Sequence, residues 1–219
     1  MKSLTMLAVL VTLPVAALAQ DAAKVDPHHY KVLVDNAVVR ILKVSYGAGE
    51  KSPMHSHPDA MLVPLTAAKV RFTMPDGKTE DRDLAAEVAN YTPAFTHSPA
   101  NLGGAMEAIL VEIKAKTGTA ATLPAARPGM AMKMLAEGAG AVAYRSTLAA
   151  DFHEAAGSTH EFDQVVISLA AGDMMLAIEG QPTANKWKRG DAHFVGRGVK
   201  HEAKNTSGKP IDVVIVALK

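Results

Sequence analysis

The stretch that decides the fold runs from residue 52 to residue 65 and reads SPMHSHPDAMLVPL. Two histidines, His55 and His57, stand one residue apart just before an apolar run. Residues two apart on a strand face the same side, so both imidazoles point either into the core or into water. In water they are ordinary polar side chains. Inside an apolar barrel two neutral imidazoles need partners, and a divalent metal ion is a partner that suits them.

The rest of the chain reads as many short strands with few helix signals. Its β-branched or alternating apolar segments are separated by turns such as Pro75-Asp76-Gly77. The passage Thr117–Gly129 interrupts the pattern and is the predicted linker between two domains, residues 28–116 and 130–219. The expected strands are Val38–Ser45, Met61–Leu65, Lys69–Met74, Val88–Thr92, Ala108–Lys114, Val142–Leu148, Val165–Leu169, Met174–Ile178, Ala192–Val195 and Asp212–Leu218.

The two halves can be laid on each other. His57 matches His160 at an offset of 103 residues, and His97 matches His201 at an offset of 104. The closing strands, AILVEIK and VVIVALK, end 105 residues apart. So small a drift across features of different kinds indicates a tandem duplication. The spacing of the strands predicts that each copy is an all-β sandwich or barrel.

His97 follows His57 after enough strands to bring the chain back across a barrel, where it would supply a third nitrogen donor. With this residue the sequence resembles a known family. The pattern Gly49-x5-His55-x-His57 is similar to the first motif of the cupins, and His97-x3-Asn101 is similar to the end of their second motif.

In the second half, Gly190-x7-Gly198-x2-His201-x3-Asn205 fits the second cupin motif more fully. Cupins are small jelly-roll barrels. The resemblance therefore implies an all-β chain of two tandem jelly-roll (cupin) barrels, a bicupin, and it covers nearly all of the sequence after residue 19. Carried over residue by residue, it implies a metal site of His55, His57 and His97 in the first barrel.

One departure from the cupin pattern has a chemical consequence. Cupins usually place a metal-binding glutamate after the second histidine with three or four residues in between, where this chain has Met61 or Leu62. A metal held by three neutral imidazoles keeps its full charge, which favours anionic ligands and lowers the pKa of bound water. A Met61→Glu change is therefore expected to weaken an anionic ligand.

Two neighbours leave alternatives open. Asp59 shares strand parity with the histidines and could replace the glutamate, but the interpretation we favour is a turn residue that faces water. Met54 and Met61 would favour copper if a thioether faced the metal, and otherwise they fill the core, which we prefer.

The second half carries a poorer donor set. The positions that match His55 and His57 are Ser158 and His160, and Gln164 stands at the glutamate position. The candidate second-barrel site is thus His160, Gln164 and His201, and a barrel kept for packing or ligand shaping is the preferred interpretation. Other histidines lie outside the motifs: His153, His193 and the pair His28-His29, a solvated pair or a transient ligand.

The first 19 residues read as a secretory signal peptide, with Lys2, an apolar stretch and Ala17-Leu18-Ala19 before the cleavage point. The run is too short, and too interrupted by Pro14, to favour a membrane anchor. We therefore expect a periplasmic or secreted protein. Its 22 basic and 22 acidic residues after cleavage leave no electrostatic footprint for nucleic acid or for a charged membrane surface. The absence of cysteine excludes thiolate ligands and a cysteine nucleophile.

Fold does not settle function, and two classes remain open. The first is a metal-dependent oxidoreductase, dioxygenase-like, that binds Fe, Mn, Cu, Ni or Zn and acts on a small anionic or enolic organic molecule; an isomerase or lyase is a further enzymatic option. The second is a non-catalytic periplasmic protein that binds metal or a small ligand. Neither the metal, the substrate nor the oligomeric state follows from the sequence.

Overall fold

The computed structural model describes residues 20–115, 127–183 and 185–219. Within these ranges the chain is built from strands and one short helix, α1 (Ala22–Val25), whose N-cap Asp21 accepts a hydrogen bond from the Ala23 amide. No helix in the described ranges has the length and apolarity that crossing a bilayer would require. The predicted signal peptide, residues 1–19, lies outside the described residues.

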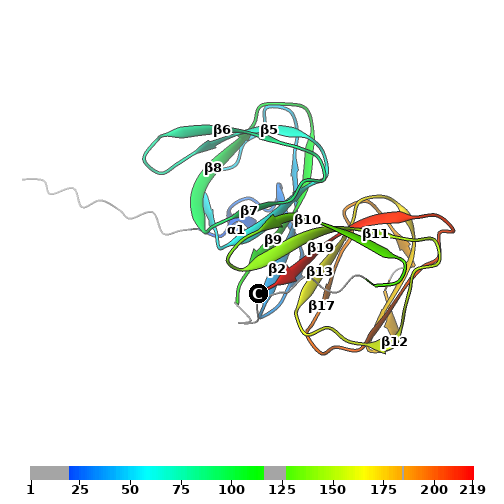
Figure 1. Ribbon diagram of the computed structural model, residues 1–219. Coiled ribbons are helices and arrows are strands. Elements are labelled where there is room, and N and C mark those ends of the chain that lie inside the picture. Colours follow the sequence, from blue (N-terminus) through cyan, green and yellow to red (C-terminus); the bar gives the residue numbers. More distant parts are fainter. Residues whose placement is uncertain (1–19, 116–126, 184) are drawn as a thin grey trace, which may run out of the picture.

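The first half forms two antiparallel sheets, with strand orders β1-β2-β9-β4-β7 and β3-β8-β5-β6. Figure 1 shows them curved around one interior. Helix α1 contacts β1 and β3. The strands are β1 (Tyr30–Asp35), β2 (Val39–Tyr46), β3 (His55–His57), β4 (Ala60–Pro64), β5 (Ala68–Thr73), β6 (Thr79–Leu84), β7 (Asn90–Thr92), β8 (Phe95–Asn101) and β9 (Met106–Ile113).

The second half repeats this plan, with strand orders β10-β11-β19-β13-β17 and β12-β18-β14-β15, and β16 paired to β14. The strands are β10 (Met130–Glu137), β11 (Ala141–Leu148), β12 (His153–Ser158), β13 (Gln164–Ser168), β14 (Gly172–Ile178), β15 (Gln181–Pro182), β16 (Lys186–Trp187), β17 (Ala192–Val195), β18 (His201–Asn205) and β19 (Ile211–Leu218).

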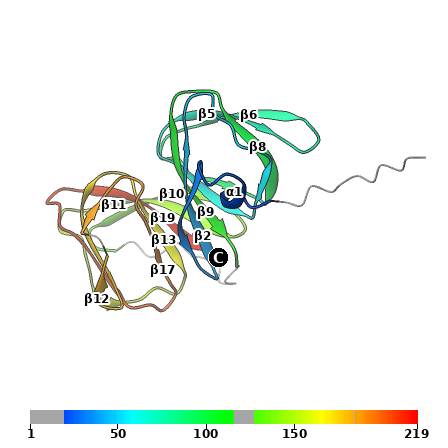
Figure 2. The same cartoon turned by 180° about the vertical axis from the view of Figure 1, so that it is seen from behind.

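The matching strand orders make the molecule two tandem jelly-roll barrels, as predicted. Even an irregularity is repeated, because the register of β1 on β2 shifts between Val32 and Val34 and that of β10 on β11 between Met134 and Ala136. The two barrels occupy separate ends of the molecule (Figure 2). The predicted linker, Thr117–Gly129, falls largely outside the described residues, so the exact domain boundaries stay predictions.

All ten expected strands are present, with ends that differ by one or two residues. Several of the missed strands are short or exposed. β6 reads TEDRDL, and four of its six residues are exposed, so it lacks the apolar alternation that marks a half-buried strand.

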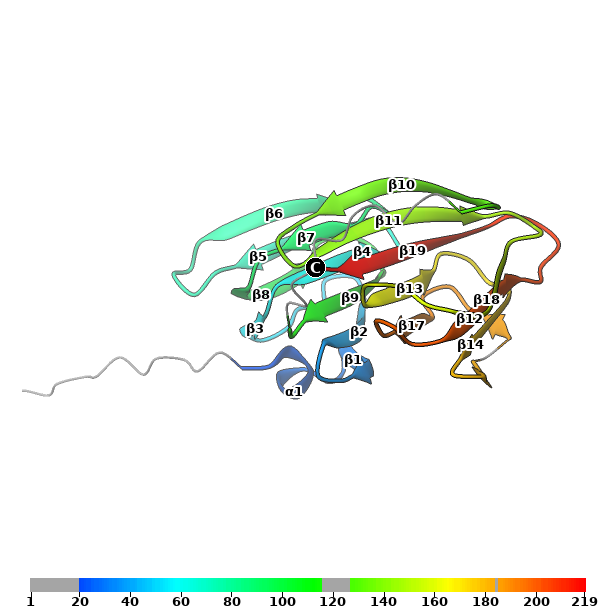
Figure 3. The same cartoon turned by 60° about the horizontal axis from the view of Figure 1, so that its bottom comes forward.

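The two barrels pack back to back through their five-stranded sheets. One core cluster combines Val39, Ile41 and Met61 of the first barrel with Val165 and Val216 of the second, among others. Figure 3 shows β4 and β9 beside β19 and β13 in the middle of the molecule. Each of these sheets is covered on both faces, which explains the unbroken apolar runs AILV within β9 and VVIVAL within β19. Separate apolar clusters fill the two barrel interiors.

Candidate metal centre

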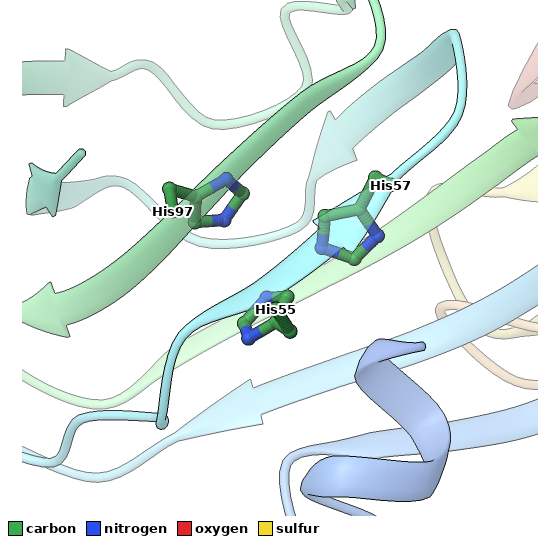
Figure 4. Close-up of side chains that lie close together, drawn as sticks. All are labelled: His55, His57 and His97. Atoms are coloured by element: carbon green, nitrogen blue, oxygen red, sulfur yellow. The ribbon is translucent and has the colours of Figure 1, made fainter. Parts of the chain in front are cut away.

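The three predicted histidines meet inside the first barrel. Strands β3 and β8 pair antiparallel, with His55 directly opposite His97 and His57 on the same face two residues on. All three side chains are buried, and their ring centroids lie 4.8 to 5.3 Å apart. Figure 4 shows the rings turned towards a shared space between the two strands. One potential ligand atom from each histidine lies within 4.8 Å of the others.

Hydrogen bonds leave nitrogen lone pairs for this space. His55 Nδ1 lies 2.7 Å from the carbonyl oxygen of Pro53, which accepts its proton, and His55 Nε2 is buried without a partner. His97 Nδ1 is likewise buried without a partner. Because buried polar atoms are rarely left unsatisfied, these orphan nitrogens and the all-imidazole donor set fit a divalent transition metal.

Glu112 is a residue of this site that the sequence analysis missed. It lies on β9, is 1% exposed, and accepts the Nδ1 proton of His57 at 2.6 Å. Its other oxygen accepts from Arg40 Nε at 2.5 Å, and Arg40 also pairs with Asp21. A carboxylate that accepts the Nδ1 proton of an imidazole fixes its tautomer and leaves the lone pair of Nε2 available to bind a metal. The available signal was a lone glutamate in the apolar strand AILVEIK, where VVIVALK has Ala217.

Burial keeps His55 and His97 neutral. It lowers the pKa of His55 to about 4, with a further contribution from His57. It lowers the pKa of His97 to about 2, again with contributions from the neighbouring histidines. Neutral imidazole is the form that binds metal, so the barrel interior holds these two side chains in the form of a metal ligand.

The structure corrects the expectation for the position at which cupins have a metal-binding glutamate. Met61 points away from the histidines into the core between the barrels, which confirms the core-filling interpretation. The next residue, Leu62, faces the barrel interior and lines its cavity. Asp59 does lie in the bend between β3 and β4, but it is half-buried instead of facing water, and it accepts hydrogen bonds from the Tyr91 hydroxyl at 2.8 Å and the Ala94 amide at 2.9 Å.

The repeated asparagine has a structural role. The side-chain amide of Asn101 donates to the carbonyls of Gly47 and Gly104, and that of Asn205 donates to the carbonyls of Leu148, Ala149 and Lys209. Both side chains therefore hold together loops at one end of their barrel, which accounts for this part of the repeat without a metal.

A cavity of about 150 Å³ adjoins the histidines. His57 and His97 line it, together with apolar side chains from several strands, Tyr30, Tyr46 and Arg82. The guanidinium of Arg82 lies 5.2 Å from the centre of the Phe72 ring and is bonded to Glu80. An apolar cavity with a few polar groups beside a cluster of donors is typical of a small-molecule site.

The second barrel brings together a different set from the one predicted. His160 and His201 lie near Glu154, at 3.6 and 3.3 Å, while Ser158 stands opposite His201 as the counterpart of His55. Gln164 lines the same cavity of about 40 Å³, but pairs with Ala217 as Ala60 pairs with Glu112. An extra residue before β13 therefore makes Gln164 the counterpart of Ala60, not of Met61.

Arg127 reaches into this second cluster. Its guanidinium forms an ion pair with Glu154 and lies 2.6 Å from His160 Nδ1. Burial and the Arg127 charge lower the pKa of His160 to about 3. A fixed positive charge therefore already neutralises the one carboxylate of the cluster.

The remaining histidines lie apart from both clusters. His153 is exposed and bonded to Glu202 at 3.1 Å, and the half-buried His193 packs on Trp187 with ring centroids 4.4 Å apart. His28 and His29 gather with Glu50 at the surface of the first barrel.

Comparison with known proteins finds similar folds. No protein-family model matches the sequence, and no curated protein matches it significantly. Among solved structures, AerE from Microcystis aeruginosa superposes with a TM-score of 0.63 at 13% identity, covering 87% of this chain and 97% of that one. A cupin 2 conserved barrel domain protein from Leptotrichia buccalis gives 0.56 at 10% identity, covering 87% and 88%.

A third similar structure is the salicylate 1,2-dioxygenase of Pseudoaminobacter salicylatoxidans with gentisate, with a TM-score of 0.61 at 13% identity. The match covers 84% of this chain and 70% of the dioxygenase. At such low identities these likenesses show the fold alone, and that fold is the one shared with cupin-domain proteins.

Proposed function

We propose that the chain is a metal-binding bicupin whose first barrel holds a divalent transition metal through His55, His57 and His97. In this proposal the adjoining cavity binds a small anionic or enolic organic molecule, and the protein is a dioxygenase-like oxidoreductase. The observation that carries it is the convergence of three buried imidazoles, two of them with unpartnered nitrogens, on the edge of an apolar cavity.

The metal, when bound, would supply open coordination positions for a substrate and for O₂. Three neutral histidines leave its charge undiminished, and Glu112 does not change this, because it contacts His57 and Arg40 instead of sharing the ligand space. The role of Glu112 is to orient His57.

The cavity supports the substrate class. A volume of about 150 Å³ is similar to that of an engineered cavity that holds benzene, so a ring of that size fits. Arg82 offers a positive charge on the cavity wall. Tyr30, which also lines the cavity, carries a hydroxyl proton and is hydrogen-bonded to the Tyr46 hydroxyl at 2.9 Å. Burial raises the pKa of Tyr30 well above its usual value, so that proton stays in place.

A periplasmic location is part of the proposal and rests on the signal-like residues 1–19. The dioxygenase-like chemistry has its support in the fold shared with salicylate 1,2-dioxygenase, which was solved with gentisate.

The second candidate function is a non-catalytic periplasmic protein that binds metal or a small ligand. The second barrel favours this function, because its donor set has changed. Ser158 stands in the place of His55, an extra residue precedes β13, and the Arg127 guanidinium lies beside His160. If catalysis occurs, we place it in the first barrel.

The test is metal analysis of the mature protein from its native compartment, compared with His57→Ala and with its counterpart variant His160→Ala. We expect His57→Ala to hold one tightly bound metal ion fewer than the wild type, and His160→Ala to hold the same number as the wild type. Equal metal content in the wild type and in a folded His57→Ala protein would sink the proposed centre.

Adding gentisate to the metal-loaded protein then separates the two functions. A changed metal spectrum with consumption of O₂ supports the oxidoreductase. A changed spectrum without turnover supports the binding protein.

A further inference from the structure

We propose that His28, His29 and Glu50 form a second divalent-cation site, for a first-row ion such as zinc, at the surface of the first barrel. It is distinct from the three-histidine centre and from the donor cluster of the second barrel.

His29 is the fixed donor of this site. It precedes β1, is 8% exposed, and donates its Nδ1 proton to the Asp26 carboxylate at 2.6 Å. Asp26 also accepts from the His29 amide at 3.3 Å and from the Ser52 hydroxyl, so the carboxylate is held in place. A carboxylate behind one ring nitrogen presents the other, here Nε2, as a metal donor.

The contact between His29 Nε2 and the Glu50 carboxylate indicates a cation site. Nε2 lies 3.1 Å from Glu50 Oε2. A neutral imidazole has one N–H, yet both nitrogens of His29 face carboxylate oxygens. With the proton on Nδ1, two lone pairs oppose each other between His29 and Glu50. A positive species at that place, a second proton or a metal ion, removes the conflict.

His28 completes the set. Its exposed ring stands edge-on to that of His29, with centroids 4.8 Å apart. Potential ligand atoms of His28, His29 and Glu50 all lie within 4.8 Å of one another. Two imidazoles and one carboxylate suit zinc, nickel or copper, and the exposed side leaves positions for water.

Glu50 is anchored from two directions. Its carboxylate accepts the Gly47 amide, and its main-chain carbonyl accepts the Asn101 amide at 2.8 Å. The loop between β2 and β3 therefore presents the third donor from a fixed position. This limits the entropy lost when an ion binds.

Aromatic rings separate the surface site from the buried centre. The His29 ring stacks on Tyr46 with centroids 4.1 Å apart, and Tyr30 lies between Tyr46 and His55, at 6.1 and 4.9 Å. The two sites share no donor, so each is expected to bind its ion independently.

The experiment is a zinc titration of tag-free, metal-stripped mature protein by calorimetry, with bound zinc counted after dialysis. His55→Ala removes the buried centre and should retain the surface site. In that background, His28→Ala and Glu50→Gln should each weaken zinc binding at least tenfold, and Asp26→Asn by about 10 to 100-fold. Circular dichroism confirms that each variant is folded.

His153→Ala is the matched control, because His153 also lies 3.1 Å from a glutamate oxygen but lacks a second histidine and a buried carboxylate behind it. It should bind zinc as the parent protein does. The proposal is overturned if the His55→Ala protein binds no zinc, or if His28→Ala and Glu50→Gln leave its affinity unchanged. Failure of the buried centre would appear separately, as equal amounts of bound zinc in the wild type and in the His55→Ala single variant.

Discussion

His57 and Glu112 lie 2.6 Å apart, ring nitrogen to carboxylate oxygen, although 55 positions separate them in the chain. In the second barrel the strand register puts Ala217 in the place of Glu112 and Val142 in the place of Arg40. The pair that orients a histidine in the first barrel is thus replaced by apolar side chains in the second. The loss of Glu112 and Arg40 distinguishes the second barrel from the first more clearly than its smaller number of histidines does.

Glu112→Gln tests that role. The amide keeps the size of the side chain but loses the charge that holds the His57 tautomer, so metal affinity in the first barrel should fall about 10 to 100-fold. Competition with a chelator of known affinity measures it. Glu107→Gln is the control, because Glu107 lies on the same strand but is half-exposed and pairs with Lys43. Equal affinities in the two variants would contradict the assignment.

Leu62→Glu replaces Met61→Glu as the test of charge at the metal. Leu62 faces the cavity, so a carboxylate there should reduce the net charge of the site and weaken an anionic ligand by about tenfold or more. Met61→Glu should instead bury an unpaired charge in the core between the barrels and destabilise the fold by several kcal/mol. Ligand titration and urea denaturation of both variants distinguish the outcomes. A stable Met61→Glu protein would show that the side chain does not lie where the structure has it.

The one-residue difference between Met61 and Leu62 shows where sequence reasoning stops. The repeat and the strand pattern predicted two barrels and brought three histidines together, because these features depend on periodicity and spacing. Side-chain direction alternates along a strand, so an error of one residue reverses the face. Glu154, which the sequence analysis did not single out, joins His160 and His201 in place of Gln164 for a similar reason, since the register of β12 on β18 shifts between Glu154 and Ser158 and a residue is inserted before β13. Glu112 has its partners on other strands, so no local pattern marks it.

Arg127→Ala tests why the second barrel should lack a metal. Removing the guanidinium leaves Glu154, His160 and His201 as two imidazoles and an unpaired carboxylate. We expect this variant to bind one more zinc ion than the wild type, because the competing positive charge is gone. Zinc counted after dialysis measures it, with His201→Ala added to Arg127→Ala as the control that should abolish the gain. An unchanged zinc count in Arg127→Ala would show that the arginine does not close the site.

Acid should destabilise the metal-free protein. Burial lowers the pKa of His55 and His97 from 6.5 to about 4 and about 2, so below pH 6.5 the unfolded chain binds protons that the folded chain does not. The free energy of unfolding should therefore fall as the pH drops from 6.5 towards these values, by up to about 1.4 kcal/mol per pH unit for each histidine. Urea denaturation of chelator-treated protein measures the slope. His97→Gln should flatten it, and an identical slope in that variant would contradict the pKa assignment.

Gly138→Ala asks whether the second barrel shapes the cavity of the first. Gly138 lies in the turn between β10 and β11, where an added Cβ would come within 2.2 Å of the Tyr91 ring. Tyr91 lines the first cavity, and its hydroxyl accepts the Gly140 amide at 3.1 Å. The extra methyl should displace this wall and weaken ligand binding on the order of tenfold.

Metal content should stay the same in Gly138→Ala, because Tyr91 is not one of the three donors. Gly104→Ala, whose added Cβ meets nothing within 4 Å, is the matched control. Calorimetric titration of the metal-loaded proteins with gentisate measures the difference. If Gly138→Ala binds the ligand as Gly104→Ala does, the second barrel contributes packing alone. A loss confined to Gly138→Ala would show that the barrel without the three-histidine set still determines what the other one binds.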